Sequence, residues 1–203
     1  MSGDAAAQSF GSSLPSASAA TPVQVTLSLR PRHPRLLERL AVASSARRPL
    51  TPTGTNLLGL VKHLIGIELG YLGDSAGRPS PLTLPWNEDG SVWEGADMWA
   101  TADESREQLL AWYRTAWEHS DTSIATIPLD APARVAWWDE SRRDTTFGHL
   151  LVRVLAETAQ HAGHCDIVRE TIDGHAGSNT DDVPDDEWAA YVARIQAAAD
   201  TFR

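Results

Sequence analysis

The chain has 203 residues, of which 42% are hydrophobic and 22% charged, which is typical of a globular protein with a sizeable core. Its formal net charge of −10 disfavours binding to a nucleic-acid backbone, so we expect no nucleic-acid partner. The single cysteine, Cys165, excludes an internal disulfide framework and a Cys-rich zinc module. Neither a membrane-span-length apolar run nor a secretion signal is found, and we therefore expect a cytoplasmic protein without membrane contact.

The N-terminal region lacks the pattern of a packed domain. Residues 1–22 are rich in Ser and Ala, so we predict a disordered tail there and a single domain over residues 23–203. The next stretch, Val23 to Arg48, is rich in arginine and contains two prolines. It could meet an acidic partner, but we interpret it as a solvated flank in which Arg35 to Ser44 could form a short helix.

The first strong helical pattern follows the turn at residues 51–54. Thr55 or Asn56 can cap a helix that ends near Gly70 to Gly73. Its apolar residues recur at the 3, 4 spacing of one helix face: Leu57, Leu60, Leu64, Ile67 and Tyr71.

A long connection and a second helix come next. Residues 74–100 hold three prolines, three glycines and three tryptophans, which favours a packed lid or binding loop. Thr101 and Glu104 have the spacing of a capping box, so we predict a helix from there to about Ile127.

The C-terminal half predicts two further helices. After a connector from Pro128 to Arg143, a helix starts beyond Thr145 or Thr146, runs to about Ile172 and is closed by Asp173 and Gly174. The last helix begins near Pro184, and its expected buried face is Trp188, Tyr191, Val192, Ile195 and Phe202. No set of alternating β-branched runs is found. We therefore predict an all-α, antiparallel four-helix bundle, with a long Trp-rich loop between its second and third helices.

Ionisable residues interrupt the predicted buried face of the helix over residues 146–172. Leu150, Val154 and Val168 are apolar, whereas Glu157 and His161 lie between them on the same stripe. Burying an unpaired carboxylate destabilises the folded state by roughly several kcal/mol, so a partner must offset that cost. Residues four apart project from one helix face, so both side chains can converge on one metal ion.

A third ligand is available on the first strong helix. His63 is the only histidine in that apolar helix and lies beside its Leu60–Leu64 stripe. Two imidazoles and one carboxylate form a ligand set known for catalytic zinc and for non-haem iron, with a position left open for water or substrate.

Other interpretations of the same residues remain open. A lone histidine beside an apolar helix face, such as His63, could be a hydrogen-bonded core residue, and Glu157 could pair with Arg153 or with His161 itself. His164 and Cys165 could add a ligand, although we favour a supporting or core-packing role for both. The ferritin-like and zincin motifs are both absent. We interpret the remaining histidines as structural or solvated: His33, His119, His149 and His175.

Two blocks of sequence carry a resemblance to a known family. One runs from Arg48 through His63 to Leu64, and the other from Glu157 through His161 to Glu170. They resemble the DinB-like family of metal-binding four-helix bundles, in the actinobacterial branch related to mycothiol-dependent S-transferases and maleylpyruvate isomerase. The likeness extends from about Arg47 to the C-terminus.

The resemblance implies a ligand set and a departure from the family pattern. It implies metal ligands at His63, Glu157 and His161, while His164 does not fall on a ligand position. Many members have a histidine where this chain has Glu157, although the isomerase-like relatives also have Glu there. The family's bundle begins with a full-length helix, whereas the corresponding region here is interrupted by prolines.

The resemblance implies a metal-dependent, thiol-linked S-transferase. Its partners would be a small-molecule thiol and an electrophile. Its cofactor would be a divalent metal ion, for which we favour zinc, with nickel or iron as alternatives. Without a thiol, the same site would favour hydrolysis. The rival hypothesis is a non-enzymatic, stress-associated bundle whose structural metal is closed by His164 or Cys165. A homodimer is a further expectation from the family.

Overall fold

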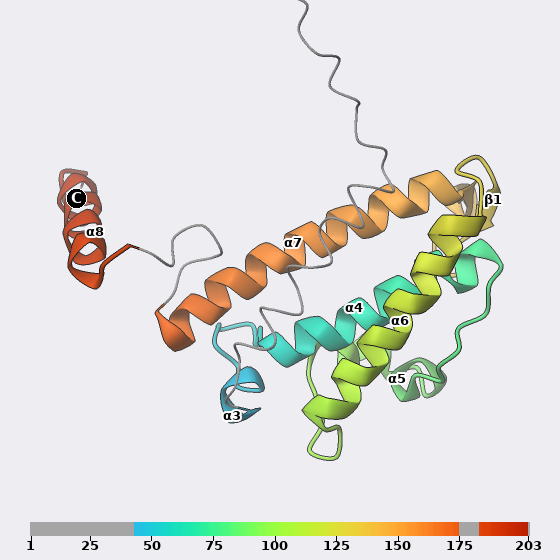
Figure 1. Cartoon of the computed structure of the whole chain (residues 1–203), viewed down its shortest axis with the longest axis horizontal. Coiled ribbons are helices and arrows are strands. Elements are labelled where there is room, and N and C mark those ends of the chain that lie inside the picture. The colour runs from blue at the N-terminus through green and yellow to red at the C-terminus, as the bar shows by residue number, and fades with distance from the viewer. Residues whose placement is uncertain (1–42, 175–182, 203) are drawn as a thin grey trace, which may run out of the picture.

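The computed structural model describes residues 43–174 and 183–202. The predicted tail at residues 1–22, most of the Arg-rich stretch, and His33 and His175 lie outside these ranges, as does all but the end of the short helix expected at residues 35–44. The fold is mostly helical (Figure 1), and its α-helices are α3 (Ala43–Ala46), α4 (Leu57–Leu72), α5 (Pro85–Glu88), α6 (Arg106–Thr126), α7 (Phe147–Asp173) and α8 (Asp185–Asp200).

Helix α4 is the central element. Asn56 caps it, as one of the two predicted candidates, and its side-chain oxygen accepts a 2.7 Å hydrogen bond from the Gly59 N–H. Most of the helix is buried because α6 and α7 both pack against it, and Figure 1 shows it between them. A helix buried on several sides needs an almost continuous apolar sequence, which α4 has.

Two apolar clusters hold these helices together. The first joins α4 to α6 and to the C-terminal half of α7, where Cys165 and Val168 are buried. The second joins the end of α4 to the start of α7, with Tyr71, Phe147 and Leu150 among its members. The middle of α7 therefore lies where the two clusters meet, and the polar residues predicted on its buried stripe are there.

Helix α6 begins later than the capping-box pattern predicts. Ser105, not Thr101, caps it, by accepting from the Gln108 N–H. The Glu104 carboxylate does reach back to the Thr101 N–H at 2.8 Å. The same carboxylate also accepts a hydrogen bond from Lys62 of α4. Residues 101–104 form turns rather than helix. The predicted end near Ile127 is confirmed, since the helix stops at Thr126.

The segment between α4 and α6 is more regular than the predicted loop. It contains α5 and three 3-10 turns: η1 (Asp74–Ala76), η2 (Ser91–Glu94) and η3 (Ala96–Met98). Trp86 is buried in the first cluster, whereas Trp93 and Trp99 are exposed. The Lys62 ammonium fastens this segment to α4, because it lies 4.4 Å from the Trp86 ring centroid and donates to the Trp99 carbonyl at 3.1 Å.

The connector before α7 corrects the all-α prediction. It contains a two-stranded antiparallel sheet of β1 (Pro132–Arg134) and β2 (Asp144–Thr146), with the 3-10 turn η4 (Glu140–Arg142) between the strands. Each strand has three residues, too few for an alternating pattern to be recognisable. The pairing continues into the start of α7, where the Phe147 and Gly148 N–H groups donate to carbonyls of the connector.

The boundaries of α7 and α8 agree with those predicted from the sequence, but the predicted burial of the apolar face of α8 is not found. Thr146 caps α7, and Gly174 ends it in the left-handed conformation at φ 75°. The apolar residues of α8, expected to be buried, are largely exposed, with Tyr191 at 48% and Val192 at 58%. In Figure 1, α8 stands apart from the other helices. Among the described residues the packed helices are thus α4, α6 and α7, and a complete four-helix bundle remains a prediction.

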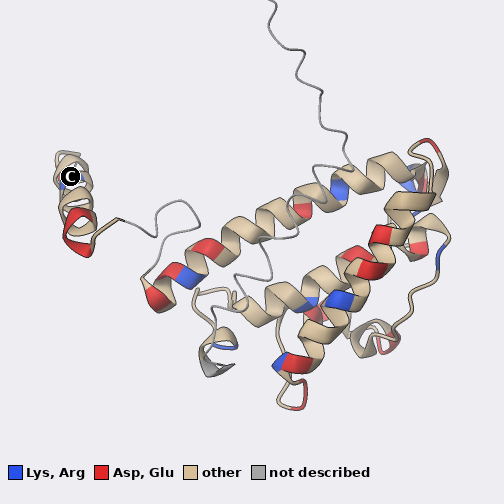
Figure 2. Cartoon of the chain, viewed as in Figure 1, with Lys and Arg blue, Asp and Glu red and all other residues tan. Residues whose placement is uncertain are grey.

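No helix in the described parts of the chain is long and apolar enough to cross a membrane. In the view of Figure 2, Lys and Arg are scattered among Asp and Glu along α6 and α7 rather than gathered into one basic surface. The absence of a nucleic-acid partner stays a prediction.

Two glycines of α4 give a matched test of how tightly η3 packs on this helix. A Cβ at Gly59 would lie 1.8 Å from the Met98 carbonyl oxygen, whereas one at Gly66 would have no neighbour closer than the Trp86 indole nitrogen at 4.0 Å. We expect Gly59→Ala to destabilise the protein by about 1–3 kcal/mol or more. Gly66→Ala should stabilise it by about 0.5–1 kcal/mol, because alanine is the better helix former. Urea unfolding measures both, and equal effects would contradict this packing.

Candidate metal centre

His63 is oriented by a carboxylate from the segment between α4 and α6. Its Nδ1 lies 2.6 Å from Oδ2 of Asp97, which is on η3 and is 9% exposed. A carboxylate only accepts hydrogen bonds, so Nδ1 of His63 is the donor in this contact. A histidine held in this way presents Nε2 to the opposite side, which is the usual arrangement of a metal-binding histidine and its supporting carboxylate.

Glu157 is shared between two partners on its own helix. Its Oε1 lies 2.7 Å from an NH2 nitrogen of Arg153, and its Oε2 lies 3.4 Å from Nε2 of His161. Its side chain is 19% exposed, so it is half-buried rather than fully desolvated. Both pairings proposed from the sequence are therefore present, and each engages a different oxygen of the carboxylate.

His161 is buried and faces His63 across the interface of α4 and α7. The two ring centroids are 4.8 Å apart at an interplanar angle of 73°. Burial is the main reason that the pKa of His161 lies below its ordinary value. The neighbouring His63 lowers this pKa further, whereas the Glu157 carboxylate opposes the shift. The lowered pKa favours the neutral imidazole near pH 7, the form that can ligate a metal.

His63, Glu157 and His161 form a cluster that could hold a metal ion. One ligand atom from each residue lies within 4.8 Å of the others. Two atoms bonded to one zinc ion are separated by at most roughly 4.4 Å, so small side-chain rotations can bring all three into range. The donor set and its spacing fit a divalent ion bound by two nitrogens and one oxygen.

The two residues left open as additional ligands have different surroundings. His164 is exposed, and its Nδ1 lies 3.4 Å from Nδ1 of His161. Cys165 is buried at 5% exposure and belongs to the apolar cluster beside α4. The structure thus puts Cys165, rather than His164, on the buried stripe, and neither residue belongs to the metal-ligating cluster found in the described part of the chain.

Sequence reasoning missed the role of Asp97. It is one of several acids in a long connection, and no periodicity marks it. The only signal near it is indirect. Gly59 lies one turn before His63 on α4, and the single lysine, Lys62, immediately before it; both lie against the segment that contains Asp97.

These features define a helical protein with a histidine and glutamate cluster of metal-binding type at the interface of α4 and α7. A model of the mycothiol-S-transferase family matches residues 36–174, more than half of the chain. The chain therefore belongs to the mycothiol-S-transferase family, which is DinB-like, and the resemblance found in the sequence is confirmed. A comparison with curated proteins finds no match. Membership supports a mycothiol-related S-transferase function at the level of the family.

The environment of Cys165 predicts an unreactive thiol. Burial, with a smaller contribution from the Asp166 charge, raises its pKa to about 12. Only the thiolate is an efficient nucleophile. We expect iodoacetamide to alkylate the folded protein at pH 8 more than about 100-fold more slowly than the urea-unfolded chain. Mass spectrometry over time measures both rates, and rapid labelling of the folded protein would contradict the burial of this side chain.

Proposed function

We propose that the protein is a metal-dependent S-transferase that joins a small-molecule thiol to an electrophile. The observation that carries the proposal is the convergence of His63, Glu157 and His161 in a member of the mycothiol-S-transferase family. Zinc is the metal that this donor set favours, with nickel or iron as alternatives. When bound, the divalent ion would lower the pKa of a coordinating thiol and so supply thiolate at neutral pH.

The protein residues have separable tasks in this proposal. His63, Glu157 and His161 hold the ion, and Asp97 keeps the Nε2 lone pair of His63 directed at it. Arg153 holds one oxygen of Glu157, and the other oxygen, which faces Nε2 of His161, would ligate the ion. Three protein ligands leave at least one coordination position open, which favours a catalytic over a closed structural site.

The reaction is balanced without an oxidant or reductant. When the thiol adds to an activated carbon–carbon double bond, the thiol S–H bond and the π bond of the electrophile break, and an S–C bond forms at one carbon. The thiol proton ends on the neighbouring carbon. In displacement, the S–C bond forms as the bond to the leaving group breaks, and the proton passes to solvent. The metal keeps its charge in either case, as a redox-inert ion such as zinc requires.

Metal analysis of the wild type and two variants tests the ligand set. We expect stoichiometric metal in the wild type, its loss in His161→Ala, and its retention in His164→Ala, an exposed histidine three residues further along the same helix. Inductively coupled plasma mass spectrometry gives the metal content, and circular dichroism confirms that each variant is folded. The metal-loaded wild type should consume a low-molecular-weight thiol in the presence of a reactive electrophile, whereas the stripped protein should not.

Three outcomes would contradict the proposal. Retention of full metal by a folded His161→Ala protein would remove this residue from the ligand set. Loss of metal in His164→Ala would indicate a fourth protein ligand and favour the structural-metal hypothesis. Metal-dependent hydrolysis of the electrophile without thiol consumption would favour a hydrolase instead.

The contact between Asp97 and His63 gives a separate prediction. Asp97→Asn keeps the shape of the side chain but removes its charge, and the amide can present an N–H to His63. We expect zinc affinity to fall about 10–100-fold, the usual effect of losing such a supporting carboxylate. Competition with a zinc-binding dye measures this affinity. Asp103→Asn, an exposed acid nearby in the chain, is the control and should leave the affinity unchanged. Equal affinities in the two variants would show that Asp97 does not support the site.

A further inference from the structure

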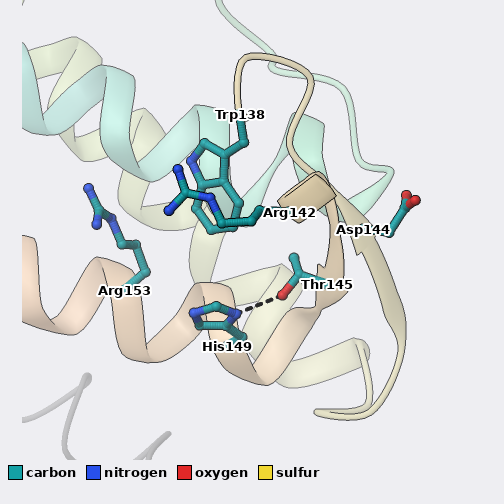
Figure 3. A pocket seen from close by; sticks show the side chains of 6 residues that line it. All are labelled: Trp138, Arg142, Asp144, Thr145, His149 and Arg153. Atoms are coloured by element: carbon teal, nitrogen blue, oxygen red, sulfur yellow. Dashed lines mark hydrogen bonds between the residues drawn. The ribbon is translucent and has the colours of Figure 1, made fainter. Parts of the chain in front are cut away.

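A second feature lies beside the cluster, at the N-terminal end of α7. A cavity of about 500 Å³ is lined by residues of the connector, β2 and α7: Trp138, Arg142, Asp144, Thr145, His149 and Arg153. Figure 3 shows these side chains around it. This volume falls within the usual range for small-molecule sites. His149, which the sequence indicated to be structural or solvated, is one of its lining residues.

The charges around the cavity favour an anion. Two guanidinium groups line it, those of Arg142 and Arg153, and Figure 3 shows both turned toward the same side. The one acid in the lining, Asp144, is neutralised by Arg134 at 2.6 Å, and in the figure its carboxylate points away from the two arginines. Each of these charged residues has a partner outside the lining, so the cavity presents guanidinium N–H donors together with an aromatic surface from Trp138.

Both arginines have donors to spare. Arg142 uses an NH2 group to bind Asp139 at 2.8 Å, and Arg153 uses an NH2 group to bind Glu157. A guanidinium has five N–H donors, so each of these ion pairs leaves donors for a second acceptor. The spare donors of a guanidinium can receive both oxygens of a carboxylate, and the Trp138 indole beside them suits an acid that carries a ring or a double bond rather than a bare inorganic anion.

Arg153 connects the cavity to the cluster. It lines the cavity and also contacts Glu157 at 2.7 Å. The four residues His149, Arg153, Glu157 and His161 follow one another at intervals of four on α7. They thus follow a stripe of α7 that turns by about 40° at each step, or roughly 120° from His149 to His161. Because the Arg153 guanidinium contacts Glu157, a ligand carboxylate bound by Arg153 would lie beside this residue of the cluster.

We propose that this cavity binds the carboxylate of a small unsaturated or aromatic acid, which is the electrophilic substrate of the enzyme. This assignment of substrate class rests on the proposed function. Arg142 and Arg153 receive the carboxylate, Trp138 contacts the apolar part of the ligand, and His149 completes the wall. Binding at the cavity itself needs only these residues and no metal.

The test is a binding measurement on the full-length, metal-stripped protein, so it does not depend on catalysis. Benzoate is the probe, benzamide its neutral counterpart and inorganic phosphate the competing anion, each titrated by isothermal calorimetry. We expect benzoate to bind at least about tenfold more tightly than benzamide or phosphate, because it alone combines a ring with a carboxylate. Arg142→Gln should weaken benzoate binding by a similar factor, and Arg114→Gln, an exposed arginine of α6, should not change it.

Arg142 is the diagnostic variant because it does not contact the cluster. Its substitution should leave the zinc content unchanged and should raise KM for a carboxylate-bearing electrophile but not for its amide. No benzoate binding, equal binding by Arg142→Gln, or binding of phosphate as tight as that of benzoate would overturn the proposal. Failure of the thiol transfer reaction with benzoate binding intact would instead count against the proposed function and leave the anion site standing.

Discussion

The burial of one ammonium group determines how the segment between α4 and α6 is placed. Lys62 is 1% exposed, and a buried charge is tolerated only with strong partners. It finds the Glu104 carboxylate at 2.8 Å, the Trp99 carbonyl and the face of Trp86. All three belong to the same stretch of chain, so satisfying this single lysine holds the stretch against α4. The segment also packs closely on α4 at Gly59, where a Cβ would lie 1.8 Å from the Met98 carbonyl oxygen.

This attachment reaches the candidate centre through Asp97. The helices α4 and α7 contribute His63, Glu157 and His161, and their packing alone brings the rings of the two histidines together. The orientation of His63, however, depends on a carboxylate outside the helix pair. On the other side, the Arg153 guanidinium restrains Glu157. The cluster is thus supported by one anion and one cation, which balance the electrostatic demands of a half-buried mixture of imidazoles and carboxylate.

The sequence predicts those parts of the molecule that have a long periodic pattern. The cap at Asn56 and the end of α7 at Gly174 follow from capping residues beside helical patterns. Helical spacing pairs Glu157 with His161, while His63 is added as a candidate on a second helix and by the resemblance to the family. The paired strands of the connector are too short to show a period. The start of α6 differs from the prediction because the Glu104 carboxylate accepts hydrogen bonds from both the Thr101 N–H and the Lys62 ammonium. The contact with Lys62 is tertiary, and no local sequence pattern contains it.

The carboxylate that orients His63 lies on a three-residue 3-10 turn, while the three side chains of the cluster lie on long helices. Turns and connections tolerate insertions and substitutions that helix interfaces do not. Substitutions in this connection can therefore change the orientation of the His63 imidazole while every residue of the cluster stays the same. Within the family, divergence of reactivity is expected to accumulate in the connection rather than in the helices.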